Sequence, residues 1–295
     1  MLLETALVLL AHCLPSATSL AMPEGPTVPI WAELLDAKPS RAVVKDADLR
    51  RRITETGLAW RVRDRTTGVE LLLVPPGTYE RGASRGDDLA GMEEKPRHTV
   101  TITAPFYLGR YEVQKHEWDH LVDGAELSNR PGLPKEGLGF DDVVAYLRRA
   151  NQADDTESSP LRLPTEAEWE YACRAGTDGP VYGKSLSSVA WYRDNAGDRA
   201  RVVGTRKANA LGFHDMLGNV KEWCSDHYDP AEYERIAAAP DLGVDPAGSS
   251  NPSNGHVLRG GAYSRPMSEA RASARQRRYS DPVIRPYGLR VARHP

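Results

Sequence analysis

Cysteine is scarce in this chain of 295 residues: there are three, Cys13, Cys173 and Cys224, and no two of them form a CxxC pair. Three cysteines cannot build a disulfide framework, and without a CxxC pair neither a cysteine-based zinc site nor a thioredoxin-type redox centre is expected. The cysteine count excludes these thiol-based classes and leaves the cellular compartment open.

Long apolar segments are also missing. After residue 21, no segment approaches the roughly 20 apolar residues that a membrane span needs. Residues 1–21 begin with an apolar run and end on Ser19-Leu20-Ala21, which fits the cleavage site of a secretory signal, but Glu4 stands where a signal carries positive charge. We therefore keep two interpretations of residues 1–21, a signal peptide or an apolar N-terminal helix, and both an exported and a cytoplasmic location.

No strong excess of charge of either sign is present, since the formal net charge is −3. This value gives no electrostatic reason to expect binding to nucleic acid. The charge is nevertheless uneven: from Arg259 to Pro295 there are nine arginines against Glu269 and Asp281, so this tail carries +7 and the remainder −10. The basic tail indicates a role that the overall charge conceals.

Glycine and proline are abundant, with 25 and 22 residues, and favour a turn-rich fold over a helix bundle. We interpret residues 22–68 as a linker and N-terminal extension, with short helices at 31–35 and 46–56 and a strand at 60–64. Residues 69–295 are expected to form one α+β domain, because buried or alternating strands at 69–74, 98–103 and 106–113 precede helices at 114–122, 140–150 and from Thr165 onward. Thr165 and Glu168 form a capping box at the start of that last helix.

Six motifs follow one another in the predicted domain. They are Pro75–Tyr79, Tyr111–Val113, Arg162–Ala172, Gly212–Trp223, Leu258–Gly261 and Gly288–Arg290. This succession resembles the formylglycine-generating enzyme (sulfatase-modifying factor) domain family over residues 69–293. The resemblance implies a C-type-lectin-like α+β fold that is rich in irregular loops, with short strands and two or three helices.

The oxidases of that family convert a cysteine to formylglycine with molecular oxygen and a copper ion held by two cysteines. Thiolates suit monovalent copper because both are soft, but the matching positions here are Arg265 and Ala270. Cys173 matches a position that pairs with a cysteine of the last strand in some members, where this chain has Val291. We therefore expect Cys173 and Cys224 to be small buried side chains, no bound copper, no catalytic residues and no formylglycine formation.

Some members of the family also bind calcium through a side-chain oxygen, two main-chain carbonyls and a carboxylate. The matching residues here are Asp215, Gly218, Val220 and Glu222. Calcium takes several oxygen ligands at about 2.3–2.6 Å, so the resemblance implies calcium as a cofactor. The alternative is that Asn219 and Glu222 only stabilise a tight turn while Asp215 is solvated.

Residues 116–120 read His-Glu-x-x-His. On a helix, His116 and His120 would face one side and could share a zinc ion, with Glu117 as general base of a metalloprotease. The resemblance offers a simpler interpretation, a short helix with an aromatic residue at Trp118, and the sequence that follows lacks the spacing of a third ligand. We favour a solvated helix face.

The basic tail separates into framework and surface residues. Arg259, Arg271, Arg275 and Arg290 match arginines that recur in the family, where a buried guanidinium can tie loops together through backbone carbonyls. Arg265, Arg277, Arg278, Arg285 and Arg293 are the excess that a partner could contact. The residues between Gly261 and Gly288 that we predict to bind a ligand are Tyr263, Ser264, Arg265, Met267, Glu269, Arg277, Arg278, Tyr279 and Arg285.

This basic and aromatic set suits a protein or peptide ligand, in particular an acidic one, and an ordinary solvated surface is the alternative. The sequence therefore predicts a binding or accessory module of the sulfatase-modifying-factor type. A second hypothesis is an iron- or copper-dependent oxidoreductase with non-thiolate ligands. Its candidate ligands are His98, His116, His120, His214, His227 and His256.

Overall fold

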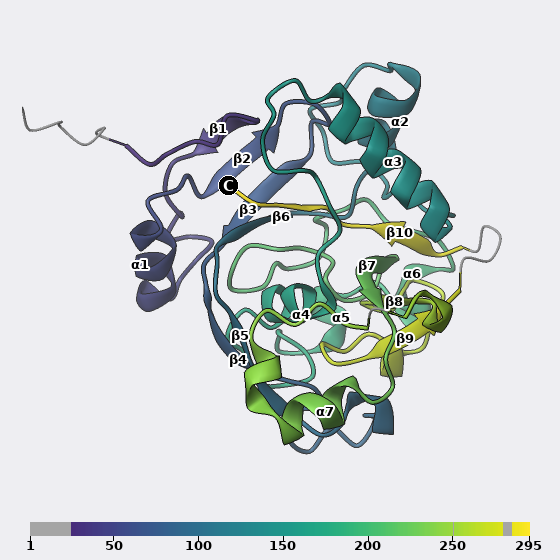
Figure 1. Ribbon diagram of the computed structural model, residues 1–295. Coiled ribbons are helices and arrows are strands. Elements are labelled where there is room, and N and C mark those ends of the chain that lie inside the picture. Colours follow the sequence, from purple (N-terminus) through teal and green to yellow (C-terminus); the bar gives the residue numbers. More distant parts are fainter. Residues whose placement is uncertain (1–24, 250, 280–284) are drawn as a thin grey trace, which may run out of the picture.

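The strands form three sheets in the computed structural model, which describes residues 25–249, 251–279 and 285–295 (Figure 1). A five-stranded antiparallel sheet has the order β1-β2-β3-β6-β11, a four-stranded sheet has the order β10-β7-β8-β9, and β4 pairs with β5. The strands are β1 Ala32–Asp36, β2 Arg61–Asp64, β3 Glu70–Val74, β4 Gly77–Arg81, β5 His98–Ile102, β6 Phe106–Gly109, β7 Lys221–His227, β8 His256–Arg259, β9 Arg275–Arg278, β10 Tyr287–Leu289 and β11 Ala292–Arg293.

Seven α-helices lie in the described residues, and two of them are only four residues long. They are α1 Ala47–Glu55, α2 Lys115–Asp123, α3 Phe140–Ala153, α4 Glu166–Arg174, α5 Leu186–Val189, α6 Arg193–Ala196 and α7 Glu232–Ala238. None of the helices that the structure describes is long and apolar enough to cross a membrane. The predicted α+β class is confirmed, with three main helices of the domain where we expected them and the short α5, α6 and α7 in addition.

Helix starts follow the local chemistry of the sequence. The predicted capping box opens α4: the Thr165 amide donates to Glu168 Oε2 at 2.8 Å, and the Glu168 amide donates to Thr165 Oγ1 at 3.1 Å. The Asp46 side chain caps α1 by accepting from the Leu49 amide at 2.7 Å. Local capping therefore fixes these two helix starts before any tertiary contact is considered.

The N-terminal extension is part of the folded body, so the linker interpretation of residues 22–68 is wrong for the described residues 25–68. Residues 31–35 were expected to form a helix, but β1 pairs with β2 instead. The reason is burial: Trp31 is 1% exposed and packs edge-on against Tyr107 at a ring-centroid distance of 5.4 Å. Residues 1–21, interpreted as a signal peptide or helix, lie outside the described residues.

The C-terminal strand joins the extension to the domain. β11 pairs with β6, and Arg293 donates to Asp64 at 2.7 Å and pairs with Asp154. Arg293 is only 2% exposed, so our expectation that it faces a partner is wrong. Figure 1 shows α1 and β1 on one side of the molecule and β9 and β10, which border the predicted ligand surface, on the other.

Candidate binding surface and its buried support

The two cysteines in the described residues are buried, as expected. Neither Cys173 nor Cys224 is exposed to solvent, and burial raises the thiol pKa of Cys173 to about 12 and that of Cys224 well above its usual value. A thiol with such a pKa is not a thiolate at neutral pH. Both thiols are therefore buried and protonated in this structure, and the two positions matched to the family's copper ligands hold Arg265, which is half-buried, and Ala270, which is fully buried.

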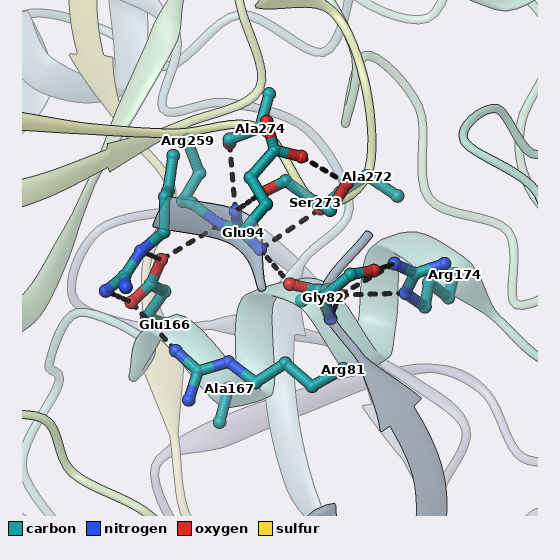
Figure 2. Close-up of polar contacts among 12 residues, drawn as sticks. Arg81, Gly82, Glu94, Glu166, Ala167, Arg174, Arg259, Ala272, Ser273 and Ala274 are labelled. Atoms are coloured by element: carbon teal, nitrogen blue, oxygen red, sulfur yellow. Dashed lines mark hydrogen bonds and ion pairs between the residues drawn. The ribbon is translucent and has the colours of Figure 1, made fainter. Parts of the chain in front are cut away.

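All four predicted framework arginines are buried, but their partners are more than backbone carbonyls. Arg259 does donate to the carbonyls of Ser273 at 2.7 Å and Ala274 at 2.9 Å, and it also pairs with Glu170 (Figure 2). Arg271 pairs with Glu94 at 2.7 Å. Each of the four arginines pairs with at least one buried carboxylate, and our sequence interpretation did not assign these pairs.

Several of these charges converge beneath the predicted surface. We use the term buried charge network for the arginines and glutamates of α4, β4, β8, β9 and α7 that contact one another there, namely Arg81, Arg174, Arg259, Arg275, Glu166, Glu170 and Glu232. Glu166 is its centre: it accepts from Arg81 at 2.8 Å and from Arg275 at 2.5 and 2.8 Å. Figure 2 shows Arg81 approaching Glu166 from the opposite side to Arg259. The network fixes β9 against α4, so the loops of the predicted surface have a rigid base.

The nine predicted ligand residues do not form one site. Tyr263 is 5% exposed, and its hydroxyl donates to Glu136 at 3.0 Å, a carboxylate that also pairs with Arg285 at 3.9 Å. Ser264 is half-buried and close in sequence to Arg265. The structure thus places Tyr263 and Arg285 together around Glu136, which the sequence interpretation missed.

A second group of the predicted residues follows β9. The Arg277 guanidinium lies 5.8 Å from the ring centre of Tyr228 and 5.4 Å from that of Tyr279, and Tyr279 is 47% exposed. Arg278 lies 5.8 Å from the ring centre of Tyr287. Cation–π contacts of this kind attract a guanidinium to the face of an aromatic ring and help to hold it in place. β9 therefore presents ordered cations next to exposed aromatic surface.

The third group borders a cleft of about 310 Å³, whose lining includes Ser268, Glu269, Arg271 and Gln276 together with Leu89, Gly91, Glu93 and Glu94. Lys221, the first residue of β7, also lines it, and its ammonium lies 2.8 Å from Glu269 Oε2. Met267 lies two residues before Glu269 and is 50% exposed. Lys221 was not selected from the sequence, although it lies in the motif Gly212–Trp223 on which the family resemblance depends.

The predicted calcium ligands lie on a buried turn. Asp215 is fully buried, so it is not solvated, and one of its oxygens, Oδ1, has no hydrogen-bond partner. Burial raises the pKa of Asp215 to about 6. The Glu222 carboxylate already accepts hydrogen bonds from Arg290 at 2.6 Å and from Trp169 Nε1 at 2.6 Å. Asp215 fits the side-chain oxygen of a cation site, whereas Glu222 would first have to leave Arg290.

The same turn contains a further buried carboxyl group. Glu112 accepts from Asn219 Nδ2 at 2.8 Å and from the Val220 amide at 3.0 Å. Burial and the charges of Asp215 and Glu222 raise its pKa well above the usual value. Of these three buried carboxyl groups only Glu222 is paired with Arg290, so the turn is an environment that favours an additional positive charge.

The histidines do not gather into a metal site. His227 and His256 lie with ring centres 4.2 Å apart, but the single group of three potential ligands in the described part of the chain consists of Glu166, Asp226 and Glu232. Two of these carboxylates already pair with arginines of the buried charge network. The arrangement therefore gives no support to a three-histidine redox centre.

The His-Glu-x-x-His sequence lies on α2 and is used locally. Glu117 is buried and accepts from the Gln114 amide at 2.7 Å, which closes the N-terminus of the helix. His116 contacts Gln114 Oε1 at 3.2 Å, and His120 contacts the Ala125 carbonyl at 2.7 Å. Glu117 is thus a capping residue and is not positioned beside the two imidazoles as a general base.

Comparison with known proteins agrees with this architecture. The family model for the sulfatase-modifying factor enzyme 1-like domain matches residues 59–295, and the chain belongs to that family. The formylglycine-generating enzyme of Streptomyces coelicolor is 36% identical over a 157-residue alignment that covers 47% of this chain and 45% of that enzyme. The chaperone protein LppX of Paenibacillus barcinonensis is 27% identical over 219 residues, covering 57% of this chain and 75% of LppX.

Among solved structures, PvdO from Pseudomonas aeruginosa superposes with a TM-score of 0.69 at 25% identity, and the match covers 80% of this chain and 98% of PvdO. The chain spans about half the length of the bacterial formylglycine-generating enzymes that it matches. The expected family and fold are therefore confirmed. The match does not show that this chain has the activities of those whole proteins.

Proposed function

We propose that this protein is a non-catalytic binding or accessory module that holds an acidic, extended peptide or protein segment on the surface between Gly261 and Gly288. The observation that carries the proposal is the chemistry at the two copper-ligand positions, Arg265 and Ala270, where the chain has a guanidinium and a methyl group in place of two thiols. A fixed cation at this place repels copper and attracts a carboxylate.

The exposed cations support the proposal. Arg277 is held between two tyrosine rings, and the Arg285 side chain is 78% exposed. A guanidinium that is already ordered loses less side-chain entropy when it binds a carboxylate. The name of LppX, a chaperone, is consistent with an accessory role for a domain of this family. The oxidoreductase hypothesis has no comparable support, because the described imidazoles do not form a three-ligand group.

A peptide-binding assay tests the proposal. We expect a fluorescein-labelled pentapeptide with three glutamates to bind more tightly than its lysine counterpart. The Arg277→Gln variant should bind the glutamate peptide about 5- to 10-fold more weakly, which corresponds to roughly 1–1.4 kcal/mol, within the net range of about 0.5–1.5 kcal/mol for a typical hydrogen bond. Fluorescence anisotropy measures both. The matched control is Arg51→Gln, which removes an exposed arginine of α1. Equal binding of the two peptides would count against the proposal.

For the metal, the proposal is calcium in a structural role at Asp215, Gly218, Val220 and Glu222. The buried Oδ1 of Asp215, which has no hydrogen-bond partner, supports it, because a hard cation bonds well to a carboxylate oxygen. Asp215 would be a direct ligand, and Glu222 would have to exchange Arg290 for the ion. When bound, calcium would supply positive charge to the turn and no chemistry.

Thermal unfolding with calcium or with EDTA tests this site. We expect calcium to raise the melting temperature of the wild type by several degrees, because a ligand at about 100 times its Kd stabilises the folded state by roughly 2.7 kcal/mol. Asp215→Leu should remove the response, whereas Asp215→Asn, which keeps a side-chain oxygen, should retain part of it. A wild-type melting temperature that is the same in calcium and EDTA would contradict the assignment.

A further inference from the structure

Lys221 is a buried cation with an unusual setting. It is 3% exposed at the start of β7, and its ammonium lies 2.8 Å from Glu269. An ammonium has three N–H donors, and Glu269 is the one side-chain partner that the described residues supply. Removing a charged group from water costs several kcal/mol unless it is paired and its donors are used. Lys221 therefore lies in a position where an additional or better acceptor would be strongly favourable.

The counter-ion of Lys221 is less firmly held than those of the neighbouring arginines. Glu269 is the last residue of a short 3-10 turn, Met267–Glu269, and its side chain is 33% exposed. By comparison, Arg81 pairs with two carboxylates, those of Glu166 and Glu232, whose side chains are 0% and 2% exposed. Glu269 can therefore move toward solvent without unfolding a helix or strand, while Lys221 is fixed on β7.

Lys221 and Glu269 lie on the wall of the 310 Å³ cleft described above. Arg265 adds a second positive charge that acts on Lys221. Within the described residues Arg265 has no carboxylate partner, and its buried Nε has no acceptor. Lys221 thus has one exchangeable carboxylate as its counter-ion, with the positive charge of Arg265 nearby, next to a cavity large enough for a ligand group.

We infer that Lys221 anchors a ligand carboxylate, which takes the place of Glu269 as the counter-ion in the cleft. The inference rests on the proposed function, since it identifies the anchor and the ligand group of the same surface. In the free protein Glu269 occupies the cation, and on binding it turns outward to solvent. The ligand group is a carboxylate, supplied either by an acidic side chain of a peptide or by a small free carboxylic acid.

Chemical rescue tests the anchor. Glu269→Gln leaves Lys221 buried without a negative partner, so its melting temperature should fall by several degrees. Glutarate, and a capped pentapeptide with one central glutamate, should each restore at least half of that loss. Sodium chloride at equal ionic strength should not. The double variant Lys221→Met with Glu269→Gln, which removes both charges, should fold and show no response to either carboxylate.

The outcomes separate the two proposals. Absence of rescue in Glu269→Gln, or equal rescue in the double variant, overturns the anchor. Rescue by glutarate and by the peptide supports a peptide ligand, whereas rescue by glutarate alone supports the anchor with a small free carboxylate as ligand. Where Glu269→Gln does not fold, Glu269→Asp, which keeps the charge but moves the carboxylate away from Lys221, should lose less stability and show a smaller rescue by the same two carboxylates. Tight peptide binding that Lys221→Met leaves unchanged would overturn the anchor and leave the proposed binding function standing.

Discussion

Replacement of Glu166 by glutamine is expected to lower the free energy of unfolding by about 3–5 kcal/mol, the usual cost of removing one partner of a buried ion pair. The Glu166 carboxylate accepts from Arg81 and Arg275 at 2.5–2.8 Å, and all three side chains are 0% exposed. Glutamine keeps the shape of the side chain but removes its negative charge. Two guanidinium groups would then lie in the interior with Glu232 as their remaining shared counter-ion.

Urea unfolding followed by tryptophan fluorescence measures this loss. The matched control is Glu55→Gln on α1, where Glu55 pairs with Arg51 at 3.6 Å and both side chains are more than 60% exposed. Exposed pairs of this kind contribute about 0–1 kcal/mol, so the control should unfold at nearly the wild-type urea concentration. A loss below about 1 kcal/mol for Glu166→Gln would show that the buried charge network does not stabilise the fold as argued.

The pH dependence of the free energy of unfolding tests the buried charge network independently. Burial raises the pKa of Glu166, but the charges of Arg275, Arg81 and Arg259 outweigh it and lower the pKa to about 2. Because the unfolded value is about 4.5, the stabilisation is fully present above that pH and is lost as the pH falls toward 2. Wild type and Glu166→Gln should therefore converge in stability at the acid end of this range.

Asp226 lies beside Glu166 and acts with the opposite sign. Burial, together with the charges of Glu166 and Glu232, raises the pKa of Asp226 to about 7. A carboxyl group whose folded pKa is raised stabilises the protein least when the pH exceeds that pKa. The two neighbouring carboxyl groups thus have opposite pH dependence, because arginine charges outweigh burial at Glu166, whereas burial and the charges of two carboxylates act together at Asp226.

The network also explains how an irregular fold presents an ordered surface. Arg275 begins β9, and Arg259 ends β8 and binds the carbonyls of residues 272–274. These contacts fix the two ends of the segment that leads to Arg277 and Tyr279. A surface whose cations are held from beneath loses little entropy on binding, so the stability of the network and the proposed binding are linked.

The motifs predicted the fold because they carry local chemistry. The capping box at Thr165 and the buried strand at residues 70–74 depend on neighbours in sequence. The prediction for the N-terminal extension was wrong for the opposite reason. Residues 31–35 have no strong local preference for helix or strand, and the strand forms there because β2 offers an edge and Tyr107 packs against Trp31. Tertiary contacts decide such segments.

The candidate site was predicted less completely, because its pairs are distant in the chain. Glu166 and Arg275 are separated by 109 positions, and Glu136 and Tyr263 by 127. Neither periodicity nor spacing joins residues over such distances. Lys221 and Glu269 are likewise far apart in the chain, so the sequence alone could not predict their pairing.

The absence of oxidase chemistry is the central claim for this domain. Oxidation of a cysteine by the family's route requires copper on two thiolates, and the chain has Arg265 and Ala270 at those positions. Cys173 and Cys224 do not match those positions, and both are fully buried with raised thiol pKa values. We therefore expect that this protein does not convert cysteine to formylglycine at any measurable rate.

Turnover of a cysteine-containing peptide with the sulfatase motif tests this claim most directly. The purified protein is incubated with the peptide, copper and oxygen, and mass spectrometry follows the conversion of cysteine to formylglycine, with the Streptomyces coelicolor formylglycine-generating enzyme as positive control. The account predicts no conversion above the level of a reaction without protein. Conversion that increases with the concentration of this protein would contradict it.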